Sequence, residues 1–182
     1  MFKKQKAFTL IELIIAISVL GILTFLALPN FQKQIASNKS RAMTDEMIAA
    51  LNFTRTEALK RGRAVTLCPA DTDGPNASDC GTDWLNGWLA VVDTATSETT
   101  KPPLVANTAA ILRRWEKLDK ERTTITAAPV GRQFFRYTGL GSLANTDTGT
   151  ATITMKVLKC SGDRVITIFP SGMLTANSPS CI

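Results

Sequence analysis

The sequence predicts an α+β protein in which one long N-terminal helix packs on an antiparallel β-sheet head. An apolar run opens the chain, an amphipathic helical pattern follows it, and short β-rich runs separated by turn residues begin after residue 62. The length of 182 residues and the hydrophobic share of 45% fit one folded domain. We expect four segments: a leader (1–7), a membrane half of the helix (8–29), an amphipathic half (30–62) and a β-rich globular head (63–182).

The first helical segment is almost wholly apolar. From Phe8 to Leu28 it runs for 21 residues, FTLIELIIAISVLGILTFLAL. A helix of that length spans about 31 Å, which is enough to cross the hydrocarbon core of a bilayer. Because Lys3, Lys4 and Lys6 precede it, we expect the N-terminus in the cytoplasm and the head on the other side of the membrane.

One acidic residue, Glu12, lies inside this apolar run. An ionised group at the centre of a membrane helix costs about 2.5–3.5 kcal/mol, so Glu12 is a functional candidate even near the helix start. An ordinary secretory signal would end in a small-x-small cleavage site, and Phe25-Leu-Ala-Leu-Pro29 is a poor one. A cut between Ala7 and Phe8 would instead place a free amine one helical turn from Glu12, where it could neutralise the carboxylate.

The segment Ala7-Phe-Thr-Leu-Ile-Glu-Leu13, followed by an apolar helix and Pro29, closely resembles the class III signal and stem helix of type IV pilins and pseudopilins. The resemblance implies that a prepilin peptidase cuts before Phe8 and methylates the new amine. It also implies that Glu12 helps to register the incoming subunit in the filament. Ala7 departs from the glycine that usually precedes the cut, and alanine is similarly small. Phe8, Glu12 and Pro29 are the expected assembly residues.

A second helical pattern follows Pro29, where a proline is expected to kink or interrupt the helix. Apolar residues recur at helical spacing over residues 31–61, with charged residues on the other faces. We expect this stripe to pack under the head. Its members are Ile35, Met43, Met47, Leu51 and Ala58, widened by Ile48 and Leu59. Gly62 is placed to end the helix, after Lys60 and Arg61 in its last turn.

The head is expected to form an antiparallel sheet from seven β-rich runs, with loops rich in turn residues between them. These runs are residues 64–68, 88–92, 110–115, 123–126, 134–137, 150–158 and 164–169. Residues 171–182 indicate a short turn followed by an irregular tail.

The head carries a second resemblance, to the GspH/FimT group of minor pilins and minor pseudopilins. Residues 50–68 (ALNFTRTEALKRGRAVTLC) look like the helix-to-first-strand segment of that group, and residues 84–93 (WLNGWLAVVD) look like its second strand region. Within the group the chain is most similar to FimU-like minor pilins.

This resemblance implies a structural subunit that helps to prime pilus assembly at the filament tip, with other minor pilins and the major pilin as partners. Such a subunit waits in the bacterial inner membrane with its head in the periplasm, and then enters the pilus on the cell surface. A minor pseudopilin of a type II secretion system is a related alternative with the same fold and assembly chemistry.

The four cysteines, Cys68, Cys80, Cys160 and Cys181, allow three disulfide pairings. We favour Cys68–Cys80 and Cys160–Cys181, since sequential pairing encloses two loops with little core of their own in an oxidising compartment. The cysteine spacing lacks metal-binding knuckles and the chain has no histidine, so no metal site is expected. The lack of histidine also excludes Ser-His-Asp and Cys-His catalysis, and we expect neither an enzyme nor a cofactor.

The net charge of +6 raises the question of DNA binding. Cleavage before Phe8 would leave 18 basic against 15 acidic side chains. The candidate DNA contacts are Lys60, Arg61, Arg63, Arg132 and Arg136. DNA-uptake members of the group carry a Gly-Arg-x-Arg element near the C-terminus, but here Met173 and Thr175 stand at the arginine positions after Gly172. DNA binding is therefore an alternative to the structural role, and it is not the favoured one.

Overall fold

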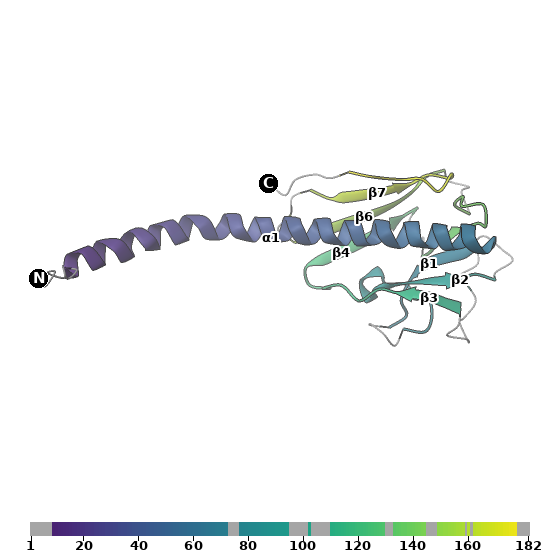
Figure 1. The fold of residues 1–182 in the computed structure, drawn as a ribbon, viewed down its shortest axis with the longest axis horizontal. Helices are drawn as coiled ribbons and strands as arrows, with labels where there is room; N and C mark the ends of the chain where they lie inside the picture. The colour runs from purple at the N-terminus through teal and green to yellow at the C-terminus, as the bar shows by residue number, and fades with distance from the viewer. Residues whose placement is uncertain are drawn as a thin grey trace, which may run out of the picture.

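The computed structural model describes residues 9–72, 77–94, 102, 110–129, 133–144, 149–158, 160 and 162–177, with the backbone alone for residues 26–30. One helix, α1 (Leu10–Arg61), projects from the head as a long stem and then crosses the head (Figure 1). A short 3₁₀ helix, η2 (Trp84–Asn86), precedes the second strand. The described part of the head holds eight strands: β1 (Val65–Pro69), β2 (Trp88–Val92), β3 (Ile111–Arg114), β4 (Thr123–Ala128), β5 (Phe135–Tyr137), β6 (Ala151–Val157), β7 (Arg164–Ile168) and β8 (Leu174–Ala176).

The two ends of α1 are capped by its own sequence. Thr9 and Glu12 form a capping box, in which the backbone N–H of each residue donates to the side chain of the other. Gly62 ends the helix in the left-handed conformation, with φ 60°, as predicted from its place after Lys60 and Arg61.

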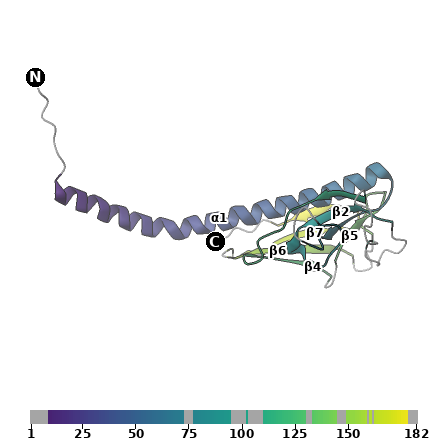
Figure 2. The same cartoon turned by 90° about the horizontal axis from the view of Figure 1, so that it is seen from below.

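The helix is not interrupted at residue 29, because all 52 residues of α1 are helical. A proline removes one backbone hydrogen bond, and a helix of this length can accommodate that loss by bending. Figure 2 shows α1 curving along its length without a break. The stem and the part of α1 that packs on the head are therefore one continuous element.

The strands form two antiparallel sheets with the orders β3-β2-β1-β5 and β4-β6-β7-β8. All seven predicted runs are strands, with bounds shifted by no more than two residues. The irregular tail predicted from residue 171 is wrong in part, because β8 pairs with β7 there (Ile166 opposite Ala176). Unlike the aromatic-rich β5, the residues Leu174–Ala176 of β8 carry little local strand preference, and among the described strands they pair only with β7.

The core lies between α1 and the strands, and Figure 2 shows α1 along one face of the head. Met47, Leu51 and Ala58 of the predicted stripe are fully buried there. Ile35 and Leu59 were also expected to be buried, but their side chains are 53% and 49% exposed. Ala36, next to Ile35, is buried, and so is Ala58, the predicted member next to Leu59. Ile35 and Leu59 therefore lie beside the packed stripe.

Candidate assembly surfaces

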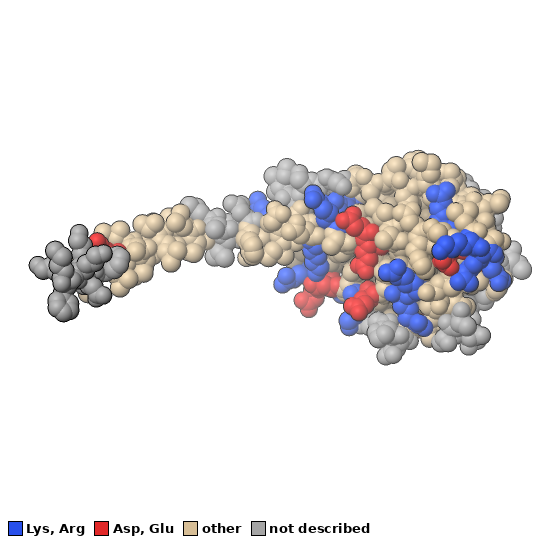
Figure 3. Space-filling model, in the orientation of Figure 1, with Lys and Arg blue, Asp and Glu red and all other residues tan. Residues whose placement is uncertain are grey.

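The first part of α1, residues 10–25, is apolar on almost every side. From residue 10 to residue 25, all the large hydrophobic side chains are 45–79% exposed: Leu10, Ile11, Leu13, Ile14, Ile15, Ile17, Val19, Leu20, Ile22, Leu23 and Phe25. In Figure 3 this part of the stem is almost free of charged residues. A helix that is hydrophobic all round is stable only when other apolar groups cover it. This stem surface therefore requires partners from outside the chain.

We expected residues 8–28 to span a membrane. Among the helices of the described residues, none combines the length and the apolar character needed for a membrane crossing. Residue 8 and the side chains of residues 26–28 lie outside the described part of that segment.

Glu12 is held at the start of the stem by Thr9. Its carboxylate accepts hydrogen bonds from Thr9 N at 2.9 Å and from Thr9 Oγ1 at 3.0 Å. A carboxylate in the first turn also interacts favourably with the helix dipole. Ala7 and Phe8, the predicted processing site, lie outside the described residues. The predicted contact of Glu12 with the amine of Phe8 therefore stays a prediction.

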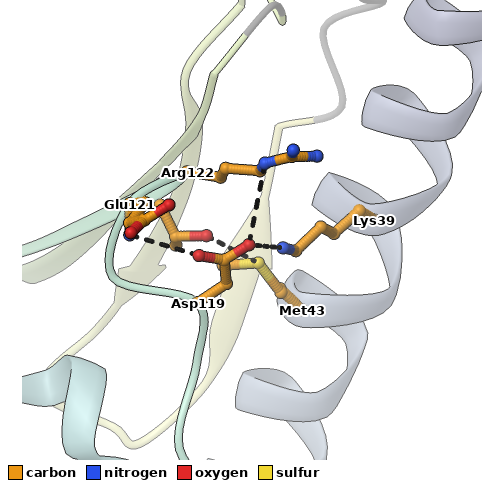
Figure 4. A network of polar contacts seen from close by, with 6 residues as sticks. Lys39, Met43, Asp119, Glu121 and Arg122 are labelled. Atoms are coloured by element: carbon orange, nitrogen blue, oxygen red, sulfur yellow. Dashed lines mark hydrogen bonds and ion pairs between the residues drawn. The ribbon is translucent and has the colours of Figure 1, made fainter.

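A polar network joins α1 to the head at the point where the stem meets the head (Figure 4). Lys39 Nζ lies 3.0 Å from Asp119 Oδ2, and Arg122 Nε lies 4.0 Å from the same oxygen. The hydrogen bond from Lys39 lowers the pKa of the Asp119 carboxyl. Sequence reasoning missed this network, because Lys39 and Asp119 are 80 residues apart and no local pattern connects them.

A cavity of about 310 Å³ lies beside the network. Its lining comes from α1 and from the neighbourhood of the β4–β6 pair: Gln32, Ile35, Ala36, Lys39, Arg122, Val157 and Leu158. The cavity has both aliphatic and cationic walls. No cluster of three or more Asp, Glu, Cys or His side chains in the described ranges is placed to hold a metal ion.

Three predicted DNA contacts lie together at the C-terminal end of α1. Lys60, Arg61 and Arg63 are exposed. Lys60 and Arg61 also contact Glu57, at 3.3 Å and 2.9 Å. The hydrogen bond from Arg61 lowers the pKa of the Glu57 carboxyl. These cations are accessible to a partner at this end of the head. Lys60 and Arg61, in the last turn of α1, also interact favourably with the helix dipole.

Arg136 has a different environment from the other DNA candidates. It is 4% exposed, and its Nε lies 2.7 Å from Asp93 Oδ2. Thr66 Oγ1 donates to the same carboxylate oxygen at 2.6 Å. The guanidinium therefore belongs to a buried ion pair, and little of its surface is accessible to a phosphate group. Arg132, the remaining candidate, lies outside the described residues.

The predicted disulfide between Cys68 and Cys80 is present. It ties β1 to the segment before η2, within a small apolar cluster that includes Leu89 and Val91. Cys160 is also disulfide-bonded. Its predicted partner Cys181 lies outside the described residues, so the pairing Cys160–Cys181 stays a prediction.

Two family profiles match the sequence. The profile described as "Type II transport protein GspH" matches residues 43–172, which is most of the chain. The profile described as "Prokaryotic N-terminal methylation motif" matches residues 2–28. Together they confirm both resemblances that the sequence predicted.

Curated pilus proteins are similar to part of the chain. The "Type IV major fimbrial protein FimA" of Dichelobacter nodosus is 34% identical over 97 residues, which are 53% of this chain and 54% of that protein. A "Fimbrial protein" of Pseudomonas aeruginosa is 36% identical over 73 residues, covering 38% of this chain and 46% of that protein. The chain thus spans about half the length of the curated relatives it matches.

The fold is similar to that of a solved pilin. The crystal structure of the type IV minor pilin FimU of Pseudomonas aeruginosa, in space group P21, matches with a TM-score of 0.57. The alignment covers 79% of this chain and 90% of that one, at 20% sequence identity. The predicted architecture, a long helix on antiparallel strands, is therefore that of a minor pilin.

Proposed function

The chain belongs to the GspH family, and we propose that it is a minor pilin, a structural subunit that helps to prime type IV pilus assembly at the filament tip. The exposed apolar stem is the observation that carries the proposal. Its side chains, exposed from Leu10 to Phe25, need other apolar surfaces to cover them. Parallel stems of neighbouring subunits provide such surfaces in a filament, and lipid provides them before assembly.

In the proposed mechanism a prepilin peptidase cuts the chain between Ala7 and Phe8 and methylates the new amine. The subunit then waits in the bacterial inner membrane, with its head in the periplasm. Glu12 exchanges its contact with Thr9 for the amine of Phe8 on an adjacent subunit. This exchange fixes the axial position of the stem before other minor pilins and the major pilin follow.

The substitution Glu12→Ala tests this mechanism. We expect the head to stay folded, because the described contacts of Glu12 are with Thr9 alone. The amount of chain in sheared pili, measured by immunoblot against the amount in the cell membrane, should fall at least about tenfold, equivalent to about 1.4 kcal/mol. Asp163→Ala removes an exposed carboxylate of the head and serves as the matched control. Normal incorporation of the Glu12→Ala chain would contradict the proposal.

A minor pseudopilin of a type II secretion system is the alternative within the same family. The stem geometry is the same in both roles, so the discriminating measurement is genetic. Deletion of the chain should abolish piliation and leave protein secretion unchanged. The reverse outcome would identify the chain as a pseudopilin.

DNA binding is the second candidate function, and the exposed cations Lys60, Arg61 and Arg63 are the observation in its favour. The test is a salt titration of duplex DNA binding by the full chain in detergent. A DNA-binding role requires binding that weakens steeply with salt and that is lost when the three residues are changed to Ala. Absence of binding at low salt would leave the structural role alone.

A further inference from the structure

The end of the head farthest from the stem tip carries exposed apolar side chains of its own. Leu140 is 89% exposed, Met173 is 60% exposed and Leu59 is 49% exposed. We call these three residues the distal patch. They come from three segments: the last turn of α1, the β5–β6 connection and the turn between β7 and β8. The stem surface of residues 10–25 lies at the opposite end of α1 (Figure 1).

Close backbone packing brings the three segments of the distal patch together. A Cβ added at Gly172 would overlap the carbonyl oxygen of Gly141, so the two turns touch. A Cβ added at Gly141 would lie 3.0 Å from Leu59 Cδ2, so the first of these turns also touches the helix. Leu140 and Met173 adjoin these glycines in sequence.

Hydrogen bonds fix the same arrangement. Arg55, on α1, donates through Nε to the carbonyl oxygen of Gly141 at 2.9 Å and through Nη2 to that of Ser171 at 3.0 Å. Leu143 N donates to the carbonyl oxygen of Pro170 at 2.9 Å. The distal patch is therefore presented on a fixed surface, which lowers the entropy cost of binding a partner.

The surroundings of the distal patch are basic. Residues 55–63 contain four cations (Arg55, Lys60, Arg61 and Arg63) and one carboxylate, Glu57, which already contacts two of them. The two turns, residues 138–144 and 169–176, carry no charged residue. Figure 3 shows basic side chains gathered at this end of the head. The result is an apolar centre with a cationic border.

We propose that the distal patch docks the head of another pilin subunit, one that presents an apolar contact bordered by Asp and Glu side chains. An exposed apolar centre inside a polar border is typical of protein–protein interfaces. A nucleic acid would contact the cations but would gain little from Leu140 and Met173. The cationic border selects an acidic partner and orients it. This inference rests on the proposed function, because it names a partner of the pilus subunit.

Site-specific photo-crosslinking tests the inference in the full chain, expressed in its own cells. Benzoylphenylalanine replaces Leu140 in one variant and exposed Thr124, on β4, in the matched control. We expect ultraviolet light to join position 140, but not position 124, to a second protein. Mass spectrometry should show that this protein carries an N-terminal methylation motif and that the adduct maps to a segment containing Asp or Glu. An adduct that nuclease removes, or no adduct at position 140, would overturn the inference.

Two further variants test the two halves of the surface, each in the chain that carries the crosslinker. Met173→Ser reduces the apolar centre, and Lys60→Ala combined with Arg63→Ala reduces the cationic border. Each should lower the adduct yield at least about fivefold, while Lys156→Ala, an exposed cation on β6, should not. The thermal midpoint of each chain checks that the head is folded. Unchanged yields in both patch variants would contradict the proposed surface.

The amount of this chain in sheared pili distinguishes a failure of this inference from a failure of the proposed function. If the chain is present in sheared pili and position 140 gives no pilin adduct, the inference fails and the proposed function stands. If the chain is absent from pili, the proposed function fails, and the adduct is scored in the membrane fraction. A pilin adduct there would still support the distal patch as a docking surface, and its absence would overturn it.

Discussion

Arg136 shows how the neighbours of a residue decide what the residue does. It was a candidate DNA contact, and in the sequence it follows two aromatic residues, Phe134 and Phe135. In the fold its guanidinium lies over the ring of Phe134, 5.0 Å from the centroid, and pairs with Asp93 in a buried position. Sequence reasoning could identify the charge and the aromatic neighbour, but not the carboxylate 43 residues away that takes up the charge.

The Asp93–Arg136 pair leads to the first prediction. Asp93→Ala leaves a buried guanidinium without that carboxylate, and breaking such a pair costs about 3–5 kcal/mol. The free energy of unfolding, measured by denaturant titration of the full chain, should fall by that amount. Asp163→Ala breaks the exposed contact with Lys156 and should cost less than about 1 kcal/mol. Equal losses in the two variants would contradict the assigned role of the buried pair.

Asp119 leads to a prediction about pH. Its pKa is lowered from 3.8 by Lys39, so the contact favours the folded state above pH 3.8 and loses its effect as the pH falls through the lowered value. At pH 7 the wild-type chain should therefore melt at a higher temperature than the Asp119→Asn chain. This difference in melting temperature should shrink progressively below about pH 4. Thermal unfolding of both chains from pH 7 to pH 2 measures this. A difference that stays constant across that range would rule out the ion pair as its cause.

At the scale of elements, local sequence predicted most of the fold. The period of apolar residues identified α1, and β-branched runs identified seven strands. Local patterns could not show that the strands form two sheets, since the partner of a strand is set by packing far along the chain. They also missed β8, whose three residues are held in place by pairing with β7.

The turn between β7 and β8 supplies the element-scale prediction. Gly172 and Gly149 both have positive φ, 79° and 80°. A Cβ added at Gly172 would overlap the backbone of Gly141, whereas a Cβ added at Gly149 would have no atom within 4 Å. Gly149→Ala should cost about 1–2 kcal/mol through its backbone conformation. Gly172→Ala should cost more, because the added methyl group would push the turn away from Gly141. Denaturant unfolding of the two variants measures the difference, and equal costs would contradict the close packing of the two turns.

At the scale of the whole molecule, the sequence predicted a long N-terminal helix on an antiparallel β-sheet head, and the fold confirms that architecture. The resemblance that identified the stem depended on a few residues at fixed spacing, with Glu12 in an apolar run. The surfaces of the head were harder to predict. Leu59 belonged to the expected buried stripe, yet it is exposed and lies near Leu140 and Met173. Whether a residue at the margin of such a stripe is buried depends on how far the head extends over the helix.

The stem supplies a prediction at this scale. Ile17 is exposed halfway along the apolar half of α1 and touches none of the head. Ile17→Glu should leave the thermal midpoint of the head unchanged, but should reduce filament incorporation strongly, because an uncompensated charge would be buried among neighbouring stems. Ile17→Leu is the conservative control, and sheared-pili immunoblots compare the chains. Full incorporation of Ile17→Glu would show that the stem is not packed in the filament.

The continuity of α1 determines how the molecule carries mechanical load. The same helix is the stem and a wall of the head core, with no linker between them. A pull on a filament subunit therefore reaches the head along the helix axis, in shear across the whole contact from Ala36 to Ala58. Shear loads many side chains at once, whereas peeling loads them one after another. The chain is thus built to resist tension through one continuous helix, whose packed side chains share the load.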